Sequence, residues 1–102
     1  MQGSAAMKNV RTVCFIGEEF CNDLYRCKEN GKVYARQRCD DEYVRWLTTS
    51  KCGDGYEPES PLKVGLIMRV VSKNAVDFEE EIVRIDGIGD TCAIKKHKMS
   101  WE

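Results

Sequence analysis

Hydrophobic and polar residues alternate along much of this chain with the period of two that is typical of half-buried β-strands. The longest alternation covers residues 62–72, and a second run at residues 76–86 predicts the strand that returns beside it. Shorter β-branched and aromatic runs at residues 11–16 and 91–95 predict two further strands. The pattern therefore predicts a mainly β protein that ends in a β-meander.

A β-hairpin is predicted between the cysteines at positions 27 and 39, because Asn30-Gly31 suits a primed two-residue turn. Its arms cover residues 24–28 and 32–38. Counting back from the turn separates Cys27 from Cys39 by about 16 Å, too far for a disulfide between them. Alternation then places four side chains on one face of the hairpin: Tyr25, Cys27, Tyr34 and Arg36.

The middle of the chain carries weaker signals. Residues 40–47 fit one helical turn, with acidic residues at its start, or an extended strand. Residues 52–55 predict a turn, and residues 57–61 read as a stiff linker. We therefore expect a cloning remnant at residues 1–7, a cysteine-rich module at residues 8–56, and a β part at residues 57–102 packed on it.

Six cysteines form an even set without a Cys-x2-Cys pair, which favours disulfides and an oxidising compartment over a zinc site. The hairpin geometry excludes Cys39, and an extended arm excludes Cys21, so Cys27 is left with Cys14, Cys52 or Cys92. The choice among these connectivities stays open. The expected fold class is a small disulfide-rich, mainly β protein that is secreted. The disulfide-forming residues are predicted to be Cys14, Cys21, Cys27, Cys39, Cys52 and Cys92.

The formal net charge is −1, from 16 basic and 17 acidic residues, which argues against nucleic acid or an anionic membrane as the main partner. His97 is the single histidine and lies in a basic tail, a poor setting for a general base. The acidic runs at residues 40–42 and 77–81 lack the spacing of a calcium loop and are expected to be solvated. We expect no catalytic residue, no metal site, no cofactor and a monomer.

Arginine, tyrosine and tryptophan dominate binding hot spots, and they cluster on and after the hairpin. For any single aromatic residue, burial in the core is the more common role. The cluster as a whole predicts a surface for an extracellular protein partner. Its members are Tyr25, Arg26, Lys28, Tyr34, Arg36, Arg38, Arg45 and Trp46.

The run from Cys27 through Asn30-Gly31 to Cys39 resembles the central hairpin of von Willebrand factor type C modules, over residues 14–52. Those modules usually hold more cysteines, with Cys-x-x-Cys elements that this chain lacks. The whole pattern is similar to tick salivary inhibitors of the terminal complement pathway. That resemblance implies a protein that binds complement component five and keeps the convertase from using it.

Two other functions stay open. A substrate-mimicking serine protease inhibitor would present Arg38 or Lys51, each of which precedes a cysteine. An extracellular module that binds a growth factor or matrix protein would follow from the type C resemblance.

Overall fold

The computed structural model describes residues 9–19, 21–39, 43–72, 74, 77–85 and 91–95. Three predicted segments lie outside them: the expected cloning remnant at residues 1–7, the turn around residues 87–90 and the tail that contains His97. The described part contains eight strands: β1 (Val10–Glu19), β2 (Asn22–Cys27), β3 (Val33–Arg38), β4 (Val44–Cys52), β5 (Gly55–Pro61), β6 (Ile67–Val71), β7 (Asp77–Arg84) and β8 (Thr91–Lys95). The mainly β prediction is confirmed.

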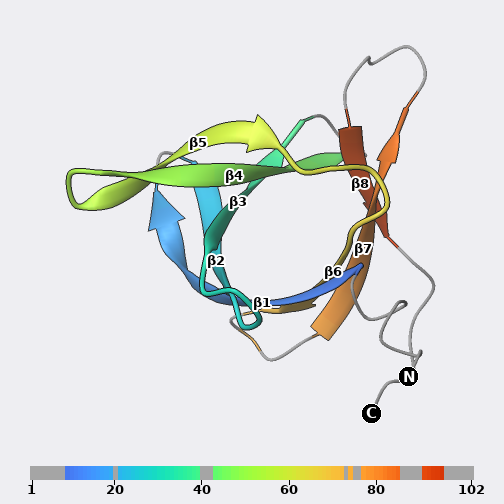
Figure 1. The fold of residues 1–102 in the computed structure, drawn as a ribbon, viewed down its shortest axis with the longest axis horizontal. Helices are drawn as coiled ribbons and strands as arrows, with labels where there is room; N and C mark the ends of the chain where they lie inside the picture. The colour runs from blue at the N-terminus through green and yellow to red at the C-terminus, as the bar shows by residue number, and fades with distance from the viewer. Residues whose placement is uncertain are drawn as a thin grey trace.

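Seven of these described strands close into a barrel (Figure 1). Around the ring the order is β1, β2, β3, β4, β8, β7, β6 and back to β1. The β1–β6 ladder is parallel, and the other ladders are antiparallel. The ladder between β4 and β8 that closes the ring is short, with Val44 opposite Ala93. β5 pairs with β4 outside the ring.

The barrel joins the two parts of the chain that the sequence suggested. Residues 57–61, expected to be a linker, belong to β5, so that prediction is wrong. Pro58 and Pro61 are compatible with a strand here because β5 lies at an edge, where a missing N–H is tolerated. The β1–β6 and β4–β8 ladders both cross the expected boundary. The meander is confirmed as β6, β7 and β8.

The β2–β3 hairpin forms as predicted, but its register differs. Tyr25 lies opposite Tyr34, so the loop holds four residues instead of two. Gly31 adopts the positive φ of 75° that the loop needs. The Asn30 side-chain oxygen accepts a hydrogen bond from the Lys32 N–H at 2.8 Å, which also stabilises the loop. A shift of two residues leaves every side chain on its face, so the predicted shared face is correct.

The inner face of the barrel holds the main core. Alternate residues of each strand point inward, which explains the burial of Met68 and Val70 on β6 and Ile82 on β7. Residues 44–47 lie in β4, so the strand alternative for this segment is the right one. The buried members of this core are Val13, Tyr25, Cys27, Tyr34, Trp46, Leu62, Met68, Val70, Ile82 and Ala93.

A second, smaller core lies on the outer face of β2, β3 and β4 and consists of Leu24, Val33, Ala35 and Leu47. Tyr56 of β5 packs against it. The β4–β5 hairpin leaves the ring and extends past the end of β1 (Figure 1).

The outer edge of β5 is partly closed to further pairing. The Tyr56 N–H donates to the Glu19 carboxylate of β1 at 3.0 Å, and Pro58 has no N–H. Such features protect an edge strand from pairing with another chain. They are consistent with the expected monomer, which stays a prediction.

Gly55 leaves room for this contact, because a β-carbon there would overlap the Glu19 carboxylate unless that side chain moved. We expect Gly55→Ala to displace Glu19 and lose the bond to the Tyr56 N–H, which costs about 1 kcal/mol of unfolding free energy. Urea unfolding measures this cost. In a Glu19→Ala background the same substitution should be nearly neutral, and an equal cost in both backgrounds would contradict the assignment.

Candidate functional site

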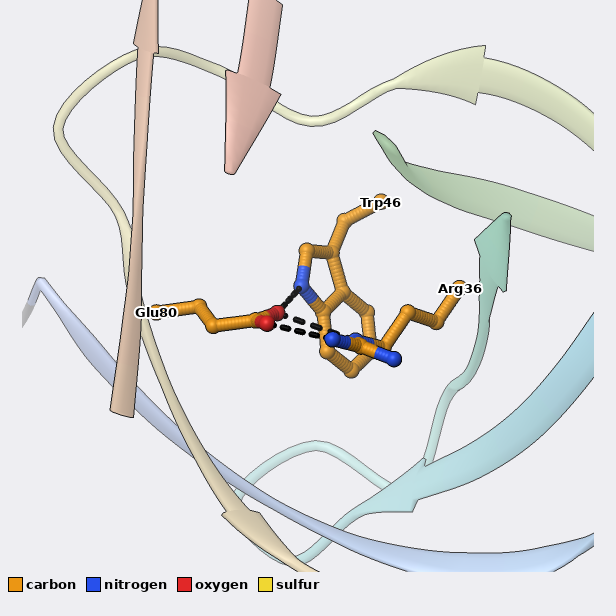
Figure 2. Close-up of polar contacts among 3 residues, drawn as sticks. All are labelled: Arg36, Trp46 and Glu80. Atoms are coloured by element: carbon orange, nitrogen blue, oxygen red, sulfur yellow. Dashed lines mark hydrogen bonds and ion pairs between the residues drawn. The ribbon is translucent and has the colours of Figure 1, made fainter. Parts of the chain in front are cut away.

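The barrel interior contains a cluster of three polar side chains, Arg36 of β3, Trp46 of β4 and Glu80 of β7 (Figure 2). The Arg36 guanidinium donates two hydrogen bonds to the Glu80 carboxylate, at 3.0 Å from Nε and 2.5 Å from Nη2. The Trp46 indole N–H donates to the same carboxylate at 2.8 Å. One carboxylate thus connects three strands.

Strand alternation brings these groups together. Arg36 and Trp46 are cross-strand partners, and Glu80 points inward from β7 as Ile82 does. The Arg36 guanidinium also lies 5.4 Å from the centre of the Phe78 ring. The expectation of a solvated acidic face is wrong for Glu80, which is 3% exposed, and for Glu79, which is 6% exposed and paired with Arg69 at 3.4 Å.

The electrostatics of the cluster favour a structural role. Burial alone would lower the pKa of Arg36, but the hydrogen bonds and charge of Glu80 outweigh burial, so the pKa is raised. An arginine of this kind stays protonated at any physiological pH. The cluster therefore holds strands together and is not arranged to transfer protons.

All six cysteines lie among the described residues, and none of them is joined to another in a disulfide. The disulfide framework expected from the sequence is therefore not present in this structure. Cys14 and Cys27 lie on neighbouring strands, but Cys27 points into the barrel beside Val13 whereas Cys14 points outward. Cys92 likewise points outward, because its neighbour Ala93 belongs to the inner core.

The Cys27 thiol is buried and donates to the Glu29 carboxylate at 3.2 Å. Burial raises the pKa of this thiol, with a further contribution from Glu29. Because the thiolate is the reactive form, Cys27 is poorly suited to act as a nucleophile.

A concave, charged part of the described surface lies where the β2–β3 loop meets the β5–β6 connection. Two clefts, of about 490 and 440 Å³, adjoin there and share Thr48 and Leu62. We call them together the basic groove. Its charged lining residues are Arg11, Arg26, Lys32, Lys51, Lys63 and Glu59.

Local contacts order parts of this groove. The Lys51 ammonium lies 5.5 Å from the centre of the Tyr56 ring, its cross-strand partner. The Arg26 guanidinium donates to the Gly31 carbonyl at 3.2 Å. Five cations against one carboxylate make a site that favours an anionic ligand.

The structure places the predicted partner-binding residues in different environments. Tyr25, Tyr34 and Trp46 are core residues, with exposed fractions of 4%, 6% and 1%, so their expected place on a binding surface is wrong. Their size and inward register explain this burial. Arg36 is held by Glu80, and Arg45 is half-buried on β4. Arg26, Lys28 and Arg38 are exposed.

Two residues of the predicted binding surface, Arg26 and Tyr34, line the groove. Lys51 was expected only for the protease-inhibitor alternative, and Lys32 and Tyr56 were not predicted. Lys51 and Tyr56 flank the tight Gly53-Asp54 turn, which pairs them across the β4–β5 hairpin. A hairpin prediction over residues 44–61 would have found that pair. Lys51 and Tyr56 lie near Arg26 only because the barrel closes, and no local sequence pattern predicts that closure.

Within the described residues, no group of histidine, cysteine, aspartate and glutamate side chains is arranged to hold a metal ion. The same part of the chain contains no helix long and apolar enough to cross a membrane. Comparisons with protein-family models, curated proteins and solved structures found no match.

Removing Glu80 tests the interior cluster. Glu80→Ala leaves the Arg36 charge and the Trp46 N–H without their acceptor inside the barrel, which is expected to cost about 3–5 kcal/mol of unfolding free energy. Chemical denaturation measures this. Glu57→Ala, at an exposed position of β5, is the matched control and should change stability by less than about 0.5 kcal/mol. Equal effects would show that the cluster does not stabilise the barrel.

Tyr25 gives a test at alkaline pH. Burial raises the pKa of its phenol above the usual value of about 10, despite an opposing effect of Arg36. The folded state binds this proton more tightly, so its stabilising effect is present below that usual value and is lost as pH rises through the folded-state pKa. Tyr25→Phe should flatten this alkaline loss of stability in thermal unfolding. An unchanged pH profile would refute the assignment.

Proposed function

We propose that this protein is a binding protein that captures an acidic segment of a partner protein in the basic groove. The observation that carries the proposal is the charge of the groove, five cations and one carboxylate in a chain whose net charge is −1. Charge separated in this way steers an acidic partner toward one part of the surface.

The scaffold supports such a role because part of the groove wall is built on paired strands. Lys51 is held by the β4–β5 ladder, and Arg26 by the β2–β3 ladder. Side chains on a fixed backbone lose less conformational entropy on binding than side chains on a mobile loop. The two adjoining clefts also suit an extended segment better than a compact ligand.

An acidic protein segment fits better than single-stranded nucleic acid. Nucleic-acid grooves combine cations with aromatic rings on which bases stack. Here Tyr34 is 6% exposed, and Tyr56 packs against the outer core with Lys51 near its ring. The tyrosines of the groove therefore offer little surface for stacking.

Within this proposal, complement component five stays the specific partner expected from the tick-inhibitor resemblance, together with secretion and a disulfide-rich extracellular form. Blocking its docking to the convertase would need only tight binding, without a catalytic group. The protease-inhibitor alternative has less support, because Lys51 lies within β4 next to a two-residue turn and not on an extended loop.

Charge reversal in the groove tests the acidic-segment proposal. The probe is a fluorescent oligoglutamate peptide of about eight residues, roughly 26 Å long when extended. We expect Lys51→Glu to weaken its binding about tenfold in fluorescence anisotropy, since an attractive contact becomes repulsive.

Arg84→Glu is the matched control, because it makes the same change of charge at an exposed position away from the groove. It should alter binding by less than about threefold. Equal losses in both variants would show that only net charge matters. Tighter binding of an oligothymidylate than of the peptide would favour nucleic acid and overturn the proposal.

A serum haemolysis assay tests the specific partner. The protein in excess over complement component five should abolish lysis, and Lys51→Glu should restore part of it. Intact lysis at saturating protein would end the complement proposal while leaving the oligoglutamate measurement unaffected.

A further inference from the structure

Two hairpin tips of this protein meet, and each carries an exposed cysteine. Cys21 lies in the turn between β1 and β2, where Glu19 pairs with Asn22. Cys52 ends β4 and pairs with Gly55 across the tight turn to β5. The remaining four cysteines are buried or half-buried.

The contact between the tips is made by Glu19. Its carboxylate accepts the Tyr56 N–H and occupies the space that a β-carbon of Gly55 would fill. Cross-strand partners project from the same face of a ladder, so the Cys52 side chain leaves the β4–β5 hairpin on the side that faces Glu19. Cys21 follows Glu19 by two residues, so the two cysteines belong to the two turns that this contact joins.

The backbone conformation of Cys21 also indicates a role for its side chain. Its φ of 68° is the one positive value among the described residues other than glycine. A left-handed conformation is unfavourable for a residue with a β-carbon, and glycine would avoid that cost. A cysteine at such a position suggests that its side chain serves a purpose.

We propose that Cys21 and Cys52 form a reversible disulfide that fastens the β4–β5 hairpin to the β1–β2 turn. With glutathione disulfide as the oxidant, one thiolate attacks it and releases one glutathione thiolate. The second protein thiolate then attacks the mixed disulfide and releases the other glutathione. The protein loses two protons and two electrons, and glutathione disulfide is reduced to two glutathiones.

The link would act on the groove wall. Lys51 and Tyr56 are the next cross-strand pair after Cys52 and Gly55. Fastening this end of the hairpin reduces its opening, which fixes the groove for its ligand. This second consequence rests on the proposed function, whereas the disulfide itself does not.

The experiment uses the full chain equilibrated with glutathione disulfide, then alkylated and digested with trypsin. In a Cys14→Ser background the tryptic peptide of residues 12–26 contains one cysteine, Cys21, and that of residues 52–63 contains Cys52 alone. We expect these two peptides to be joined and lighter by two hydrogens. Fragmentation of the linked peptide from the unsubstituted chain locates the bond independently of that background.

In the linked protein, hydrogen exchange at the Tyr56 amide should be slower by roughly tenfold, and Cys21→Ser should abolish this effect. Links to other cysteines, or glutathione adducts alone, would overturn the inference. If the bond forms but Lys51→Glu leaves oligoglutamate binding unchanged, the proposed function fails and the disulfide stands. If binding depends on Lys51 but no disulfide forms, the disulfide proposal fails and the proposed function stands.

Discussion

The ion pair between Arg36 and Glu80, with the Trp46 indole as its third member, is the constraint on which the barrel depends. Burying one charge in a protein interior costs several kcal/mol, and the cost is offset only if every partner is in place. Three strands supply those partners. Slipping β3, β4 or β7 by one residue would turn a member outward and leave the others unpaired. The cluster thereby selects one register for β3, β4 and β7.

The β4–β5 hairpin connects this interior to the surface. Trp46 anchors one end of β4 inside the barrel, while Lys51 at the other end lines the groove. Along its length the strand changes one of its neighbours, from β8 at Val44 to β5 from Leu47 onward. Two strands that line the groove, β3 and β4, are therefore ones whose positions the interior cluster fixes, and Glu19 adds a contact near the hairpin turn.

Local sequence patterns predicted most strands and the faces of the β2–β3 hairpin, because a register shift of two residues keeps each side chain on its face. They did not predict barrel closure, which depends on ladders between segments that are distant in sequence. Glu80 looked solvated because it sits in an acidic run, and its partner Arg36 is 44 residues away in sequence. Tyr25, Tyr34 and Trp46 resembled a binding surface, since the residue types that make hot spots also fill cores. The groove could not be predicted either, because it is formed by segments that are distant in sequence.

The parallel ladder between β1 and β6 has a consequence for the order in which the chain is made. β2 can cover one edge of β1 early in synthesis, but the other edge has no partner until residues 67–71 leave the ribosome. Domains form from the N-terminus at the pace of translation, and contacts between distant segments form slowly. Through this interval the nascent chain carries an unpaired strand edge, the kind of surface that chaperones protect from aggregation.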